Sequence, residues 1–266
     1  MNAYEKRMLE LLIQGKKFGV VSVKAEFEAE GTRSDELLRL LEIARRADVK
    51  VGLKIGGCEA IRDLIECKQF GVDYVIAPMV ETPYALAKFI AAKDKVFPAD
   101  EQEEMGFLFN VETISTHQHI GEMAMASRKG GVGMVFGRVD FAGSLGKDRS
   151  FVNSPEMTNY ILKAAEAAKA NDFHIVVGGG VSSESIQALR QIRKVRLDRF
   201  ETRKVIFDGS AVESDDIEAG LAVAIEFELL WLKNKRDYYN LIGAEDQSRI
   251  EMMEKRSTVK AVSAAA

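Results

Sequence analysis

The sequence predicts one α/β domain in which strands and helices alternate to form a (β/α) barrel. A chain of 266 residues, 47% hydrophobic and 29% charged, is long enough to bury one large core. Short apolar strands alternate with amphipathic helices over roughly 250 residues, which is the repeat of a TIM barrel. No glycine-rich dinucleotide motif or phosphate-binding loop follows the first strand. The alternative, a doubly wound open sheet, therefore has less support.

Composition and charge narrow the classes of function. The net charge is −4, from 37 basic and 41 acidic residues, and the basic residues are spread along the chain. We therefore expect no nucleic-acid partner. No apolar run approaches the ~20 residues of a membrane span, and charges interrupt the N-terminal segment, so we expect no membrane partner and a cytoplasmic enzyme. Cys58 and Cys67 indicate neither a disulfide framework nor a zinc site.

The first half of the chain alternates helices with three strands. A helix over residues 3–14 turns into the first strand, and Thr32 and Ser34 offer caps to the next helix. Pro83 directly follows Thr82, which marks a later helix start. The expected strands are Phe18–Ala25, Val49–Ile55 and Val72–Ala77, and the expected helices cover about residues 3–14, 34–47, 59–70 and 82–92.

The first strand has a polar face where a buried strand should be apolar. Ser22, Lys24, Glu26 and Glu28 share one parity, so their side chains point to the same side. In a closed barrel that side is the lumen. Charges at its carboxyl end either act on a ligand or neutralise one another. We consider Lys24 a substrate-binding candidate and Glu26 a catalytic candidate.

Lys54 closes the second strand and is followed by Gly56 and Gly57. A cation at the last inward position, next to glycines that let a ligand approach the backbone, suits an anionic substrate group. The structural alternative is an ion pair with Glu26, and both interpretations are compatible. Lys54 is therefore a catalytic and a substrate-binding candidate.

Residues 106–146 contain a candidate metal site. The apolar strand Phe107–Val111 ends at Glu112, and the strand Val132–Phe136 is followed by Asp140. Parallel neighbours joined by one helix present their carboxyl ends at the same edge of a sheet, so the two acids can converge. Oxygen-only ligation favours Mg²⁺ or Mn²⁺. In the structural alternative, Glu112 caps the following helix and Asp140 stabilises a loop.

The last third of the chain adds two strands. The strand His174–Val177 leads into Gly178–Ser183, which could cradle an anion or could be a tight turn with serine capping. Leu197–Asp208 is expected to form one strand, because so few residues cannot join two parallel strands. The total is seven clear strands, with an eighth missing or irregular. Helices are expected over residues 155–171, 216–233 and 245–255, and we divide the chain into a barrel domain, 1–243, and a C-terminal helix and tail, 244–266.

Three short motifs resemble those of a known family. They are Ala77-Pro-Met-Val-Glu-Thr82, Asn110-Val-Glu-Thr113, and Gly137-Arg-Val-Asp-Phe141 followed by Ser144-Leu-Gly146. In this order they resemble the HpcH/HpaI aldolase and citrate lyase beta-subunit family of the phosphoenolpyruvate/pyruvate barrel superfamily. With their flanking strands they cover roughly residues 18–232.

The resemblance implies a modified TIM (β/α)8 barrel whose last helix packs on a neighbouring subunit, in a homo-oligomer such as a trimer or hexamer. It implies a divalent metal held by Glu112 and Asp140. It also implies carbon–carbon bond cleavage or formation through a metal-stabilised enolate of a 2-oxo acid, with an aldehyde or acyl compound as the second substrate. Lys54 would neutralise the substrate carboxylate, and Gly137 falls in the substrate-binding part of the motif.

The chain departs from the family at three places. Lys54 stands where the family has an arginine, and lysine supplies a point charge without a bidentate fork. The segment Glu26–Glu30 lacks the histidine that many members use for proton transfer, so a metal-bound water or Glu26 is the expected base. Arg138 follows Gly137 where the family usually has proline, and it could return an arginine to the site or point outwards. We consider Arg138 a third catalytic candidate.

Three other functions stay open. One is a Schiff-base aldolase that uses Lys54 or Lys24 as the nucleophile. Another is a phosphate-sugar isomerase or epimerase that uses the Gly178–Ser183 cradle. The third is a non-catalytic barrel that binds a 2-oxo acid or assembles with partners.

Overall fold

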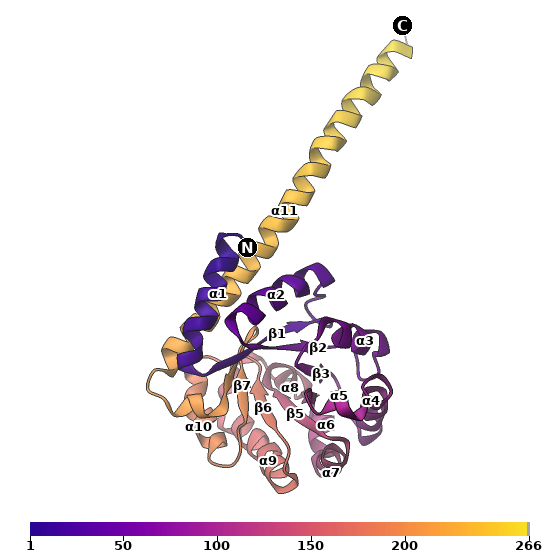
Figure 1. Cartoon of the computed structure of the whole chain (residues 1–266). Coiled ribbons are helices and arrows are strands. Elements are labelled where there is room, and N and C mark those ends of the chain that lie inside the picture. The colour runs from indigo at the N-terminus through magenta and orange to yellow at the C-terminus, as the bar shows by residue number, and fades with distance from the viewer. Residues whose placement is uncertain (265–266) are drawn as a thin grey trace.

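Eight strands close into a barrel in which the strand order follows the chain (Figure 1). This computed structural model describes the backbone of residues 1–264 and the side chains of residues 1–257. The strands are β1 Val20–Glu26, β2 Lys50–Lys54, β3 Tyr74–Ala77, β4 Gly106–Val111, β5 Val132–Gly137, β6 Ile175–Gly178, β7 Arg199–Glu201 and β8 Val205–Asp208. The predicted α/β barrel is confirmed, and closure of the sheet excludes the doubly wound alternative.

Helices surround the strands and connect most of them. The α-helices are α1 Ala3–Gly15, α2 Ser34–Ala47, α3 Ile61–Phe70, α4 Pro83–Val96, α5 Ala99–Gln102, α6 Ile114–Gln118, α7 Ile120–Gly130, α8 Arg138–Ser144, α9 Pro155–Asn171, α10 Ile186–Arg193 and α11 Ile217–Ala264. Thr82 caps α4 through the backbone N–H of Ala85, as Thr82-Pro83 predicts. The expected side-chain cap of α2 is wrong, because Arg33 occupies the N-cap and its side chain forms no capping hydrogen bond.

The last two strands form a hairpin. Strands β1 to β7 run parallel, whereas β8 is antiparallel to β7 and to β1. The Thr202 N–H donates to the Val205 carbonyl at 2.9 Å, and the Val205 N–H donates to Thr202 Oγ1 at 3.1 Å. The expectation of one strand over Leu197–Asp208 is therefore wrong. A short turn cannot join parallel strands, but it joins antiparallel ones readily, and this hairpin supplies the eighth strand.

The lumen contains an apolar layer below a charged rim. Ile76, Leu108, Val135 and Val176 form a buried cluster separate from the main core between strands and helices. The charged side chains of the first strand lie beyond it, towards the carboxyl ends of the strands. The layer closes the barrel interior, so only the carboxyl ends of the strands can present these groups to a ligand.

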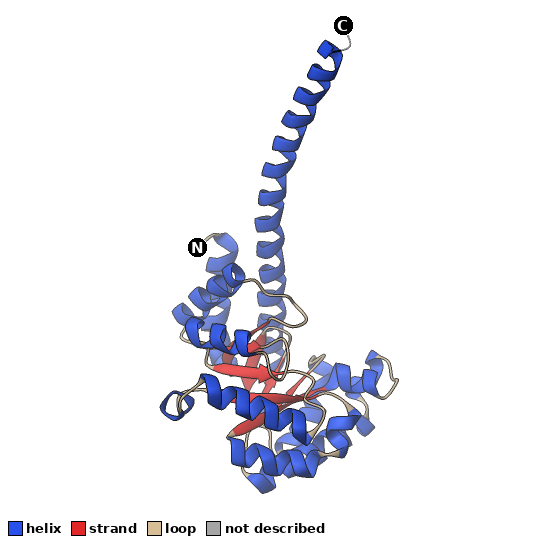
Figure 2. Cartoon of the chain, turned by 90° about the vertical axis from the view of Figure 1, so that its right-hand side faces the viewer, coloured by secondary structure: helices blue, strands red, loops and turns tan. Residues whose placement is uncertain are grey.

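The C-terminal helix α11 is one element of 48 residues. The separate helices expected over residues 216–233 and 245–255 are continuous, because neither proline nor a cap interrupts the intervening segment. The first half of α11 packs against the body through the buried side chains of Phe227 and Trp231. Its second half projects away from the barrel (Figures 1 and 2). The boundary that we placed after residue 243 falls within this helix. In the described part of the chain, no helix has both the length and the hydropathy to span a membrane.

Candidate active site

Five charged side chains gather at the carboxyl ends of four strands, and we call them the rim cluster. Lys24 and Glu26 end β1, Lys54 ends β2, Glu112 follows β4, and Glu201 ends β7. All five are buried. The inward parity predicted for the first strand therefore brings its charges together with charges from across the barrel.

Lys24 is held between two carboxylates. Its Nζ lies 2.5 Å from Glu201 Oε1 and 3.3 Å from Glu26 Oε1. Burial lowers the pKa of Lys24, but the two carboxylates outweigh burial and raise the pKa above its ordinary value. The ammonium is therefore charged at neutral pH, and Glu201 and Glu26 occupy part of its hydrogen-bonding capacity.

Lys54 forms a second bridge across the rim. Its Nζ lies 2.8 Å from Glu28 Oε2 and 3.5 Å from Glu112 Oε2. Burial lowers the pKa of Lys54, but Glu112 and Glu28 raise it by more, so the net shift is upward. Burial likewise raises the pKa of Glu26, but Lys24 and Lys54 lower it by more. Charge pairing within the rim cluster therefore keeps both lysines protonated and Glu26 ionised near neutral pH.

Glu112 is the most deeply buried acid of the rim cluster, with 1% of its surface exposed. Its Oε1 accepts the backbone N–H of Met79 at 2.8 Å, and its Oε2 accepts Asn110 Nδ2 at 2.7 Å. Met79 has a positive φ of 49°, which non-glycine residues rarely adopt. A Cβ on Gly137 would lie 3.2 Å from Glu112 Oε2. The glycine thus lets the chain that enters α8 pass directly beside this carboxylate.

Asp140 lies in the first turn of α8, three residues after Gly137, and is exposed. Among the described side chains it forms no hydrogen bond or ion pair, so both its oxygens are free. Strands β4 and β5 are parallel neighbours, as the sequence predicts, and their ends place Glu112 next to the start of α8. Joint metal binding by Glu112 and Asp140 stays a prediction. The side chains of residues 1–257 include no group of three or more His, Cys, Asp or Glu suited to a metal.

The charge balance of the rim favours a cation. Lys24 and Lys54 contact four carboxylates, those of Glu26, Glu28, Glu112 and Glu201. The positive charge of buried Lys204, which pairs with Glu30, also acts on Glu26. The Oε2 atom of Glu201 and the Oδ1 atom of Asn110 are buried acceptors without a hydrogen-bond donor. An excess of negative charge and unpaired oxygen acceptors fits a hard divalent cation with oxygen ligands.

Arg138 is buried, with 1% of its surface exposed, and contacts the loop after β6. Its guanidinium donates to the carbonyls of Gly178 and Val152, to Asn153 Oδ1 and to Ser185 Oγ, each at 3.2 Å. Burial lowers the pKa of Arg138 to about 10. These contacts tie α8 to the β6 loop, and a catalytic role for Arg138 stays a prediction.

The glycine-rich segment after β6 forms a tight turn. Gly179 and Gly180 have φ values of +82° and +69°, and a Cβ on Gly179 would lie 2.8 Å from the backbone nitrogens of Arg138 and Val139. Ser182 and Ser185 form a reciprocal capping box at the following helix start. Serine capping therefore accounts for this segment without an anion.

Sequence reasoning missed three residues of the rim. Glu201 was hidden within the segment expected to be a single strand, although its alternation with Arg199 was a usable signal. Asn110 precedes Glu112 by two positions on the same inward face. Lys204 is buried, pairs with Glu30 and lies 5.5 Å from the Trp231 ring centroid. Burial lowers its pKa more than Glu30 raises it.

No protein-family model matches the sequence, and a comparison with curated proteins finds no match. Solved structures do match. An HpcH/HpaI aldolase from Desulfitobacterium hafniense DCB-2 aligns with a TM-score of 0.60 and 13% identity, over 84% of this chain and 89% of that chain. A member of the HpcH/HpaI aldolase/citrate lyase family from Burkholderia cenocepacia J2315 has a TM-score of 0.58 and 15% identity, over 76% and 92%.

The chain has the HpcH/HpaI aldolase fold. The citrate synthase SbnG also shares it, with a TM-score of 0.57 and 18% identity, over 82% of this chain and 89% of that chain. The resemblance indicated by the three motifs is thus confirmed at the level of the HpcH/HpaI fold. At identities of 13–18%, similarity extends to architecture, and the chemistry has to be argued from the rim cluster.

Proposed function

We propose that the protein is a metal-dependent carbon–carbon lyase of the aldolase type, acting on a 2-oxo acid such as pyruvate or oxaloacetate. The observation that carries the proposal is the Lys54–Glu112 contact at the carboxyl ends of the barrel strands, beside the start of α8. In the proposal Lys54 binds the substrate carboxylate and Glu112 binds the metal, and their contact supports two roles at one place. The HpcH/HpaI fold supports this assignment.

In this proposal Glu112 and Asp140 hold Mg²⁺ or Mn²⁺. When bound, the ion would act as a Lewis acid on the ketone of the 2-oxo acid. The residues fit such an ion, because Asp140 has both oxygens free and the rim carries excess negative charge. Two protein carboxylates do not saturate a hard cation, which leaves room for water and substrate oxygens.

Lys54 then binds the carboxylate of the substrate. Its raised pKa keeps it protonated, and its flexible stem lets Nζ exchange one of its carboxylate contacts for the ligand. Gly137 keeps the space beside Glu112 open, because a Cβ at this position would lie 3.2 Å from Glu112 Oε2. Lys24 is bound to Glu201 and Glu26, so we assign it to orienting these acids.

Glu26 is the proposed proton acceptor of the chain. Its lowered pKa keeps it ionised, and its contact with Lys24 holds the carboxylate within the rim cluster. The second substrate, an aldehyde or acyl compound, would approach from the open side of the rim. Replacement of Glu26 by Gln should therefore slow proton removal from a bound 2-oxo acid by about 10²-fold or more.

The Schiff-base alternative has less support from the rim cluster. A lysine nucleophile must be neutral, and enzymes achieve this by lowering its pKa. Lys54 and Lys24 have raised pKa values because carboxylates surround them. The non-catalytic alternative predicts binding of the 2-oxo acid without turnover.

One experiment separates these functions without knowledge of the second substrate. Exchange of the pyruvate methyl protons with deuterated water is followed by NMR, with Mg²⁺, Mn²⁺ or EDTA. We expect metal-dependent exchange that Glu112→Gln and Asp140→Asn reduce at least 100-fold. Glu103 is an exposed acid at the opposite end of the barrel, where it lines a separate cavity. Glu103→Gln is therefore the matched control, and this variant should exchange the pyruvate methyl protons at the wild-type rate.

The same experiment contains the outcomes against the proposal. EDTA-resistant exchange, with a covalent adduct trapped by borohydride, would establish the Schiff-base mechanism. A thermal shift by pyruvate without exchange would indicate the non-catalytic barrel. Wild-type exchange rates in Glu112→Gln would remove the metal site from the reaction.

We also propose that the protein assembles as a homo-oligomer, a trimer or hexamer. The first half of α11 exposes Ile225, Leu229 and Leu232, which lie on one face of the helix at spacings of four and three residues. Apolar residues that recur on an exposed face favour an interface. Sedimentation velocity of the wild-type protein measures the number of copies directly.

A further inference from the structure

The projecting half of α11 carries an uncovered stripe of eight residues. Phe227 and Trp231 lie on the side of α11 that packs against the body. Because α-helical positions repeat every 3.6 residues, the residues on this side continue as a stripe along the projecting half. We call it the distal stripe, and its members are Tyr238, Leu241, Ile242, Glu245, Arg249, Met252, Met253 and Arg256. Tyr238 and Leu241 lie beside α1 and α2, and the helix beyond them projects away from the body (Figure 2).

The apolar members of the distal stripe are open to solvent. Leu241 is 72% exposed and Met253 is 56% exposed, and Tyr238, Ile242 and Met252 are also exposed. Among the described side chains, Glu245 and Arg249 form no hydrogen bond or ion pair, although they are four residues apart on one helix. A helix with such a face is stabilised by packing against a partner more than by its own propensity.

The distal stripe is complementary to itself when read in reverse. Positions symmetric about Gln247 pair Leu241 with Met253, Ile242 with Met252, Glu245 with Arg249, and Tyr238 with Arg256. Every member has its counterpart within the stripe. The pairs are two apolar contacts, one pair of opposite charges, and one arginine facing an aromatic ring. A two-fold axis at the level of Gln247 would form each pair twice.

We propose that the distal stripes of two copies of this chain pack antiparallel, so that α11 joins the copies in two-fold pairs. The contact would extend from residue 238 to residue 256, about 27 Å of helix. A parallel arrangement in register would instead place Glu245 opposite Glu245 and Arg249 opposite Arg249, which is repulsive.

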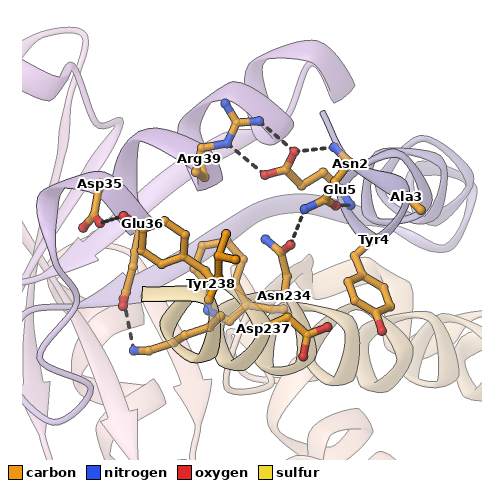
Figure 3. A pocket seen from close by; sticks show the side chains of 13 residues that line it. Asn2, Ala3, Tyr4, Glu5, Asp35, Glu36, Arg39, Asn234, Asp237 and Tyr238 are labelled. Atoms are coloured by element: carbon orange, nitrogen blue, oxygen red, sulfur yellow. Dashed lines mark hydrogen bonds and ion pairs between the residues drawn. The ribbon is translucent and has the colours of Figure 1, made fainter. Parts of the chain in front are cut away.

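A cavity lies at the base of the projecting segment, where the far end of the partner's distal stripe would come. This cavity of about 620 Å³ lies between α1, α2 and α11, and Trp231, Tyr238 and Leu241 contribute to its walls (Figure 3). Antiparallel pairing brings the partner's Met253 opposite Leu241 and the partner's Arg256 opposite Tyr238, at this cavity. The proposed partner therefore fills apolar space that is otherwise open.

Charged side chains line this cavity. The cavity is lined by four acids, Glu5, Asp35, Glu36 and Asp237, and by two bases, Arg39 and Lys235. Tyr238 donates from its hydroxyl to Asp35 Oδ2 at 3.1 Å, which fixes the ring at the edge of the cavity (Figure 3). Each of these acids already forms an ion pair, Glu5 with Arg39, Asp35 with Arg33, Glu36 with Lys235 and Asp237 with Arg236, so the proposed contact of the partner's Arg256 depends on the Tyr238 ring. Two-fold contacts require an even number of copies, so of the assemblies named above they select the hexamer over the trimer.

Charge exchange tests the pairing in the full-length protein. Glu245→Arg or Arg249→Glu places like charges opposite each other, and each should raise the dissociation constant at least tenfold in sedimentation velocity. The double variant E245R/R249E restores opposite charges and should recover the wild-type mass, an even multiple of 29.5 kDa. Glu251→Arg, the same change on another side of the helix, is the matched control and should not alter the mass.

Cross-linking tests the direction of the helices. In a chain with Cys58→Ser, a mixture of Leu241→Cys and Met253→Cys molecules should form a disulfide-linked dimer, and neither variant should do so alone. Circular dichroism confirms that each variant stays folded. A wild-type monomer at 100 μM, unaltered mass in both single charge reversals, or self-linking of Leu241→Cys would each overturn the proposal. None of these outcomes depends on catalysis.

Discussion

Replacement of Lys24 by Met should destabilise the barrel far more than loss of a surface lysine. The Lys24–Glu201 pair is 2.5 Å long, and its side chains are 9% and 5% exposed. Methionine would leave Glu201 buried with an uncompensated charge and Glu26 without a partner on its own strand. Breaking a buried pair from one side costs about 3–5 kcal/mol.

Urea unfolding followed by circular dichroism measures this loss against a control that differs in burial. Lys16 and Asp48 form an ion pair of 2.8 Å whose side chains are 39% and 96% exposed. Lys16→Met should therefore reduce the free energy of unfolding much less than Lys24→Met does, because solvent screens an exposed pair. The two lysine variants thus compare similar ion-pair lengths at different depths.

A double variant isolates the uncompensated charge from the loss of the lysine itself. Lys24→Met with Glu201→Gln removes both charges, so its free energy of unfolding should recover most of the loss seen in Lys24→Met. If Lys24→Met lowers the free energy of unfolding by no more than Lys16→Met, the rim cluster is not a buried charge network, and the reasoning fails.

Three further predictions concern the surroundings of the site. Gly178→Ala should lower the unfolding free energy by about 1–3 kcal/mol, because its Cβ would lie 2.8 Å from Glu201 Cγ, whereas Gly57→Ala, with nothing within 4 Å, should have little effect in the same urea titration. Burial lowers the pKa of His117 below its ordinary value of 6.5, so the unfolded state binds more protons at this residue and stability should fall as the pH drops below 6.5. A melting temperature that stays constant from pH 7 to pH 5, or whose pH dependence His117→Gln leaves unchanged, would contradict this. Arg138→Met should loosen the β6 loop, detected as faster amide exchange at residues 178–185, and equal exchange in variant and wild type would refute its structural role.

Local sequence patterns predicted the first strand and its charges well. The parity of Ser22, Lys24 and Glu26 follows from the period of two in any strand, and it identifies a lumen before the barrel is known. The positions of Glu112 and Asp140 after successive strands were visible for the same reason. These inferences need only neighbours in the chain, so they hold whatever the rest of the molecule does.

The errors concern information that is not local. Glu201 joins the rim through the β7–β8 hairpin, and a strand's direction depends on its partners more than on its own residues. Whether Arg138 points into the lumen or towards the β6 loop is decided by the packing of α8. The continuity of α11 was missed because residues 234–244 were left unassigned between the two expected helices.

The sequence by itself determined the barrel, the inward face of its first strand and the approximate place of a site at the carboxyl ends. Only the tertiary structure decided which charges meet there, because Lys24 and Glu201 are 177 positions apart and become neighbours only when β8 closes the barrel between β7 and β1. Periodicity records which side of an element is buried. The identity of the group opposite depends on closure, a property of all eight strands together.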